Sequence, residues 1–177
     1  MHCDASRSYH PPPCGVLHPH GGCCVSADVG VRDNLLGELM SIPRKVVAAV
    51  LARDNHRCVI AGPLCTGAGT IADHRANRGS GGSKALDIPE NLISACPVCN
   101  GMKEDANGPY RAELLARGIR VQKRATNAQT AGRCASVPVL YSDGWHYLEG
   151  VVRVPTNAHT AVEYMVLIGA IRDRWAE

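Results

Sequence analysis

The chain is 177 residues long, 45% of them hydrophobic, and it carries a formal net charge of +3. This length fits one domain of ordinary size with appendages. No apolar stretch reaches the roughly 18 residues that span a bilayer, which excludes a membrane-spanning segment, and the chain does not open with the charged start and apolar run of a signal peptide.

The positive charge is concentrated in the middle of the chain. Residues 40–125 carry 13 Lys and Arg against seven acidic residues, whereas the segments on either side are slightly acidic. A basic segment of this kind is typical of polyanion binding, and equally of a solvated basic surface. The nine cysteines, in a chain without a secretion signal, favour metal binding over disulfides.

Residues 1–39 mix prolines, glycines, cysteines and histidines without any helix or strand period. This pattern predicts a disordered N-terminal tail. A regular pattern begins at Met40, which we expect to be the natural start of the protein.

Helix and strand signals follow from residue 41 onward. Ser41 and Pro43 predict a helix start, and apolar residues at 46, 47, 50 and 51 form one stripe, so we expect a helix up to about residue 54. Short strands are predicted at 70–74 and 91–95, separated by a flexible glycine-rich loop at 75–90. Cys96 and Pro97 then predict a helix that ends by about residue 107.

The C-terminal part is expected to form a small unit of its own. A short helix at 110–117 and a basic linker at 119–135 lead to a hairpin of strands at 137–141 and 145–149, with a third strand at 151–154. Thr160 and Glu163 form a capping box for a last helix reaching about Trp175. We expect this unit to cover the core, with self-association into a homodimer through the last helix as the alternative.

These elements predict an α+β fold in four segments. Residues 1–39 are the tail, 40–108 the main domain, 109–135 a basic helix and linker, and 136–177 the C-terminal hairpin and helix.

Four cysteines form two pairs, Cys58 with Cys65 and Cys96 with Cys99. The second pair has the C-x2-C spacing that directs two thiolates to one ion, and tetrahedral zinc is the natural occupant of a four-thiolate site. Four unrelated buried cysteines are the alternative. A structural zinc is favoured because so small a domain lacks large core side chains.

Residues that can hydrolyse a phosphodiester lie between and beside these cysteines. The neutral imidazole of His74 can take a proton from water, and the carboxylate of Asp73 can hold a hard divalent cation. The amide oxygen of Asn100 can supply a second ligand, and Lys103 lies one turn further along the same helix face. Asn91 opens the second strand.

In this order, the residues resemble the HNH endonucleases. The resemblance implies a treble-clef-like ββα-metal core with a structural zinc and a catalytic Mg²⁺ or Mn²⁺. It implies that His74 is the general base, that Asp73 and Asn100 hold the catalytic ion, and that Asn91 fixes the loop that orients His74. Lys103 would contact phosphate or support the site. Asn100 stands where many members have His, which makes this an H-N-N variant.

The expected activity is therefore metal-dependent hydrolysis of double-stranded DNA, in the cytoplasm of a bacterial or phage-infected cell. A non-catalytic zinc-binding module for nucleic acid or protein is the alternative, since it needs the cysteines and basic residues alone. We expect Arg75 and Arg78 to lie nearest the scissile phosphate. The expected phosphate contacts are Arg44, Lys45, Arg53, Arg57, Arg75, Arg78 and Lys84, and the basic run continues through Arg111, Arg117, Arg120, Lys123 and Arg124.

Overall fold

The computed structural model describes residues 41–123 and 125–172, so the expected tail and start site lie outside the described residues. The α-helices in this part are α2 (Arg44–Arg53), α3 (Pro97–Glu104), α4 (Gly108–Ala116), α5 (Ala128–Ser136) and α6 (Ala158–Leu167). The strands are β1 (Ile71–His74), β2 (Leu92–Ala95), β3 (Val139–Tyr141), β4 (Gly144–Glu149) and β5 (Val152–Thr156), with short 3-10 helices η1 (Lys84–Leu86) and η2 (Pro89–Asn91). The α+β class is confirmed. None of these helices has the length and apolar character needed to cross a membrane.

Strands β1 and β2 form a two-stranded antiparallel sheet in which Ile71 pairs with Ala95 and His74 with Leu92. All four residues of β2 are buried, as a short apolar run between turn signals predicts. Helix α3 follows β2 after a single residue, Cys96. This helix starts near the Ile71 end of β1, and its Lys103 reaches the other end, where it donates to the His74 carbonyl at 2.9 Å.

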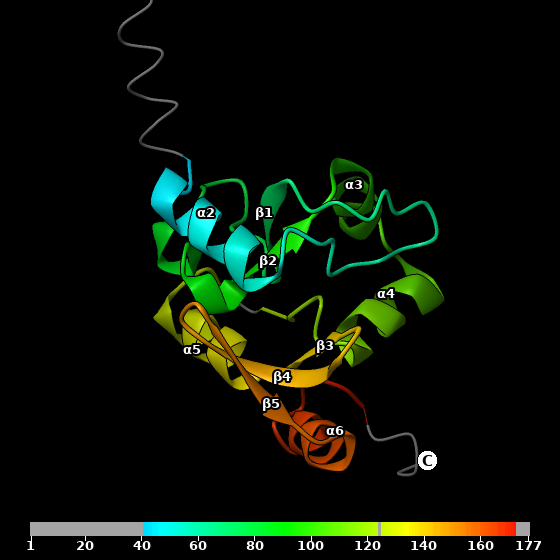
Figure 1. Cartoon of the computed structure of the whole chain (residues 1–177). Coiled ribbons are helices and arrows are strands. Elements are labelled where there is room, and N and C mark those ends of the chain that lie inside the picture. Colours follow the sequence, from blue (N-terminus) through cyan, green and yellow to red (C-terminus); the bar gives the residue numbers. More distant parts are fainter. Residues whose placement is uncertain (1–40, 124, 173–177) are drawn as a thin grey trace, which may run out of the picture.

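The second sheet has the order β3-β4-β5, antiparallel throughout. The predicted hairpin and third strand are confirmed. Figure 1 shows this sheet below β1 and β2, with α5 on one side and α6 beneath it.

One core joins the two halves of the chain. It contains Ile60 and Ile93 from the first half together with Val139, Tyr141 and Leu148 from the second sheet, all of them buried. The expectation that the C-terminal hairpin covers the core is therefore correct, because the segments on both sides of residue 108 share their buried apolar residues.

The expected linker at 119–135 is wrong over its second half, where helix α5 lies. The side chain of Asn127 caps this helix by accepting a hydrogen bond from the backbone of Thr130 at 3.3 Å. Cys134 is fully buried and packs in a second apolar cluster with Val137 and Met165. Because only one narrow face of this helix is buried, its sequence is mostly polar and gives a weak helix signal.

The last helix also differs from its prediction. It is capped by Asn157 and not by Thr160, whose backbone N–H donates to the Asn157 side chain at 2.8 Å. It ends at Leu167, because Gly169 adopts a left-handed conformation with φ of +61°. Its buried face carries Ala161 and Met165, whereas Val162 and Leu167 are exposed.

Candidate functional site

The sulfur atoms of Cys58, Cys65, Cys96 and Cys99 lie within 4.8 Å of one another. Two come from the loop between α2 and β1, and two from the start of α3. Backbone N–H groups of Gly67 and Cys99 donate to the sulfurs of Cys65 and Cys96 at 3.3 and 3.4 Å, which favours thiolates. The wide spacing of the first pair is folded back by a turn in which the Cys65 N–H donates to the Gly62 carbonyl at 3.0 Å.

The thiols of the cluster differ in acidity. Burial acts to raise the pKa of Cys96, but hydrogen bonds from the backbone of Thr66 and Cys99 outweigh it and lower that pKa to about 6. Burial raises the pKa of Cys58 and of Cys99. A group of four cysteine sulfurs, three of them on buried residues, with N–H donors suits a divalent cation, which would neutralise the thiolates together. The predicted cluster is confirmed, and it could hold a structural metal such as zinc.

His74 lies at the end of β1 with its ring partly buried. Its Nε2 is 2.8 Å from Oδ1 of Asp87, whose other oxygen accepts a hydrogen bond from Arg78 at 3.3 Å. A carboxylate accepts hydrogen bonds, so Nε2 carries the proton and Nδ1 is left as the basic nitrogen. Burial lowers the pKa of His74, and Asp87 opposes this shift only in part. The imidazole is therefore neutral at neutral pH.

Lys103 on α3 reaches back to β1. Its ammonium group is nearly fully buried and donates to Oδ1 of Asp73 at 3.1 Å, to the His74 carbonyl at 2.9 Å and to Glu104 at 3.0 Å. Burial raises the pKa of Asp73, and Lys103 opposes this shift. Oδ2 of Asp73 is buried and accepts no hydrogen bond from the described residues, although the Lys103 ammonium lies 3.0 Å away. Lys103 thus links Asp73, the His74 backbone and Glu104 through its buried ammonium group.

Asn91 is fully buried and holds the loop after His74. Its side chain accepts from the Ala76 N–H at 2.7 Å and donates to the carbonyls of Ala76 and Leu86 at 3.0 and 2.9 Å. Leu86 directly precedes Asp87, so the same amide fixes both ends of the loop that joins Asp87 to His74. This arrangement agrees with the role expected for Asn91.

Asn100 lies on α3 and is half-buried. Its side chain forms no hydrogen bond with any residue of 41–123 or 125–172. Its expected role as a metal ligand therefore stays a prediction.

Two of the seven expected phosphate contacts are wrong, because Arg53 and Arg75 are buried. Arg53 bonds Asp54 through Nε at 2.8 Å and the Leu92 carbonyl through Nη2 at 2.6 Å. Arg75 donates to five backbone carbonyls, the shortest bond being 2.6 Å to Val137. Arginine satisfies many carbonyls at once, and sequence alone does not separate this use from phosphate binding.

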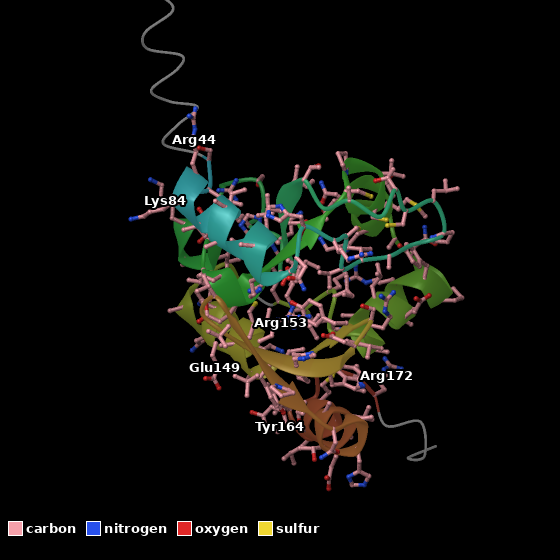
Figure 2. The ribbon with its side chains drawn as sticks, in the orientation of Figure 1. Arg44, Lys84, Glu149, Arg153, Tyr164 and Arg172 are labelled. Atoms are coloured by element: carbon pink, nitrogen blue, oxygen red, sulfur yellow. The ribbon has the colours of Figure 1, made fainter. Side chains whose placement is uncertain are left out.

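The other five candidates remain accessible. Arg44, Lys45, Arg57 and Lys84 are exposed, and Arg78 is half-exposed beside Asp87. Figure 2 labels Arg44 and Lys84, which project outward at the end of the molecule where α2 begins.

Asp87 and Glu104 were not anticipated from the sequence. Asp87 lies 13 positions after His74 in the sequence, and no motif spacing identifies it. Glu104 follows Lys103, and its carboxylate also accepts a hydrogen bond from Asn77 at 2.6 Å. The one feature of the sequence that could have pointed to these two residues is that both are acidic and lie near the expected catalytic segments.

Comparison with known proteins gives one informative result. The chain is 42% identical over 76 residues to the gene 4 protein of Mycobacterium phage L5, an alignment that covers 42% of this chain and 71% of the relative. No family model matches the chain. No solved structure matches it either.

Proposed function

The chain belongs to the same protein family as the gene 4 protein of Mycobacterium phage L5, and because that name states no activity, we propose a function from the site itself. The proposal is a metal-dependent endonuclease of the HNH type that hydrolyses DNA phosphodiester bonds. The observation that carries it is the contact of His74, at the end of β1, with the carboxylate of Asp87 at 2.8 Å, beside a buried Asp73 and a loop held by Asn91.

Each residue of this group has a chemical task that follows from its contacts. Nδ1 of His74 takes a proton from the attacking water, and Asp87 keeps the ring in the tautomer that allows this. The water oxygen bonds to phosphorus as the bond to the 3′-oxygen breaks. The departing 3′-oxygen takes a proton from solvent water, which leaves a 5′-phosphate and a 3′-hydroxyl. Lys103 and Asn91 hold Asp73 and the loop in place.

Two kinds of metal ion belong to the proposal. Zinc would be held by the four cysteines and would stabilise the loop that precedes β1. Mg²⁺ or Mn²⁺ would be held through oxygen by Asp73, whose buried Oδ2 accepts no hydrogen bond from the described residues, with Asn100 as the second expected ligand. Such an ion would stabilise charge on the phosphate and the leaving oxygen.

A second function has one observation in its favour. The ion pair between Lys103 and Asp73 already neutralises the carboxylate, as a purely structural pair would. The rival is thus a zinc-stabilised module that binds DNA without cutting it. It needs the cysteines and the exposed basic residues, but it does not need the imidazole of His74.

Plasmid cleavage separates the two functions. Purified protein is tested with added magnesium or manganese and without either, beside His74→Ala and the matched control His159→Ala, whose side chain is 87% exposed on α6. We expect metal-dependent cleavage that His74→Ala abolishes and His159→Ala leaves intact, with zinc content and DNA binding unchanged in both.

Equal cleavage by wild type and His74→Ala would rule out His74 as the base. Folded, zinc-loaded wild type that binds the plasmid with no cleavage would favour the rival. Loss of folding in His74→Ala would show that the ring is structural.

A further inference from the structure

A hollow of about 280 Å³ lies beside Lys103, on the α4 side of the site. Its basic lining residues come from four segments: Arg75 after β1, Lys103 from α3, Arg111 from α4, and Arg120 and Lys123 from the segment after α4. Asn77, three residues after His74, completes the polar wall. The hollow is therefore built by segments that are distant in sequence and adjacent to the proposed catalytic residues.

Lys103 is paired with Asp73 and Glu104, whereas Arg111, Arg120 and Lys123 form no ion pair with a described carboxylate. Arg111 forms no side-chain hydrogen bond or ion pair with another described residue. Arg120 donates to the Lys103 carbonyl at 2.5 Å, and Lys123 donates to the Asn77 carbonyl. These bonds to neutral acceptors position the two side chains, and the nearby carboxylate of Glu104 makes no ion pair with either of them.

Glu104 is the acidic residue that lines the hollow, and its carboxylate is already engaged by Lys103 at 3.0 Å and by Asn77 at 2.6 Å. Burial, followed by the charge of Arg111, lowers the pKa of Arg120, and the carboxylates of Glu104 and Asp73 oppose this shift only in part. Holding like charges together costs free energy, and a bound anion would offset that cost.

We propose that this hollow binds a backbone phosphate of the DNA strand that is cut at His74. The proposal rests on the nuclease function and gives its site a substrate-positioning pocket formed by Arg111, Arg120 and Lys123. A planar guanidinium group can donate two parallel hydrogen bonds to two oxygens of one phosphate. Lys103 bonds the His74 carbonyl and also lines the hollow, so a phosphate held here has a fixed position relative to the imidazole.

This pocket replaces the role that the sequence assigns to Arg75. Arg75 lies in the wall of the same hollow, but its guanidinium already donates hydrogen bonds to five backbone carbonyls. Arg111, Arg120 and Lys123 are therefore the residues available to contact the phosphate. In the sequence they appear only as a continuation of the basic run.

The first test is DNA binding over a range of salt concentrations, without added magnesium or manganese. The variant is Arg111→Gln, and the matched control is Arg172→Gln, an exposed arginine outside the hollow (Figure 2). By fluorescence anisotropy with a labelled duplex, we expect Arg111→Gln to bind about tenfold more weakly at low salt. The slope of log affinity against log salt should fall by about 1, while the control keeps both values. Equal behaviour of the two variants would overturn the proposal.

The second test locates the anion. Inorganic phosphate is titrated into the protein while backbone amide signals are followed by NMR. We expect shifts at Gln122 and Lys123 that disappear in Arg111→Gln and persist in Arg172→Gln. Absent shifts, or shifts that survive Arg111→Gln, would overturn the pocket. Phosphate binding by a protein that does not bind DNA would mean that the hollow takes up an adventitious ion only. That result would also overturn the proposal.

Cleavage assays on the same proteins distinguish this proposal from the proposed function. If wild type binds DNA through the pocket and does not cut, the nuclease function fails and the pocket stands as a DNA contact. If wild type cuts and Arg111→Gln cuts with an unchanged KM, the nuclease stands and the pocket fails. A raised KM with little change in kcat is the expected result.

Discussion

Oδ1 of Asp87 lies 2.8 Å from Nε2 of His74, although the two residues are 13 positions apart in the sequence. Asn91 maintains this contact, since its amide binds the Leu86 carbonyl next to Asp87 and the backbone of Ala76 two residues after His74. The loop at 75–90, which reads in the sequence as flexible, thus has both of its functional ends fixed by one buried side chain.

Replacement of Asp87 tests how the imidazole is oriented. Asp87 raises the pKa of His74 against the effect of burial, so Asp87→Asn should lower that pKa further. We expect kcat to fall on the order of 10²-fold through loss of ring orientation, with KM little changed. The pKa is measured from His74 ring signals by NMR without added magnesium or manganese. Asp105→Asn, an exposed carboxylate, is the matched control, and an unchanged or higher His74 pKa in Asp87→Asn would contradict the prediction.

Arg75 is expected to be a stability residue. Burial lowers its pKa to about 10, so it remains charged at neutral pH, and five backbone carbonyls accept its N–H groups. Arg75→Lys leaves several of these carbonyls unsatisfied and should lower the free energy of unfolding by roughly 3–5 kcal/mol. Denaturant unfolding measures the change. Arg44→Lys, at an exposed position, should change stability by less than about 0.5 kcal/mol, and a similar small change for Arg75→Lys would show that the network contributes little.

The cysteine cluster predicts a metal-dependent fold. We expect the purified protein to contain one zinc ion per chain, and a strong chelator to lower its melting temperature sharply, because zinc binding to such sites contributes roughly 10–16 kcal/mol. Cys96→Ser should lose the zinc. Cys134→Ser, a buried cysteine outside the cluster, should keep it. Elemental analysis and thermal unfolding give both values, and full zinc content in Cys96→Ser would refute the assignment.

The backbone of Gly118 lies so close to Pro138 that a side chain at position 118 would not fit without a shift. Its φ is +65°, and an added Cβ would lie 1.8 Å from the Pro138 carbonyl oxygen. Gly118→Ala should therefore destabilise the protein by more than the roughly 1–3 kcal/mol expected from backbone strain. Gly150 has a φ of +58° with no atom within 4 Å of the added Cβ, so Gly150→Ala measures the strain alone. Equal stability losses in thermal unfolding would mean that the Pro138 segment moves aside without cost.

The amino-acid sequence by itself determined the local elements with strong signals. The two short strands, the helix after Cys96, the C-terminal hairpin and the cysteine pairs follow from alternation, turn residues and spacing, which are properties of neighbouring residues. The sequence failed at α5, where few apolar residues mark the buried face, and at the end of α6, where Gly169 stops the helix before an apolar continuation.

Only the tertiary structure decided how each charged side chain is used. Arg75 and Arg111 are both arginines in one basic segment, yet the first is buried among backbone carbonyls and the second has no acidic partner among the described residues. The partnership of His74 with Asp87 likewise depends on a loop closed by Asn91. Burial and long-range hydrogen bonds set these roles, and both arise from chain segments that the sequence places far apart.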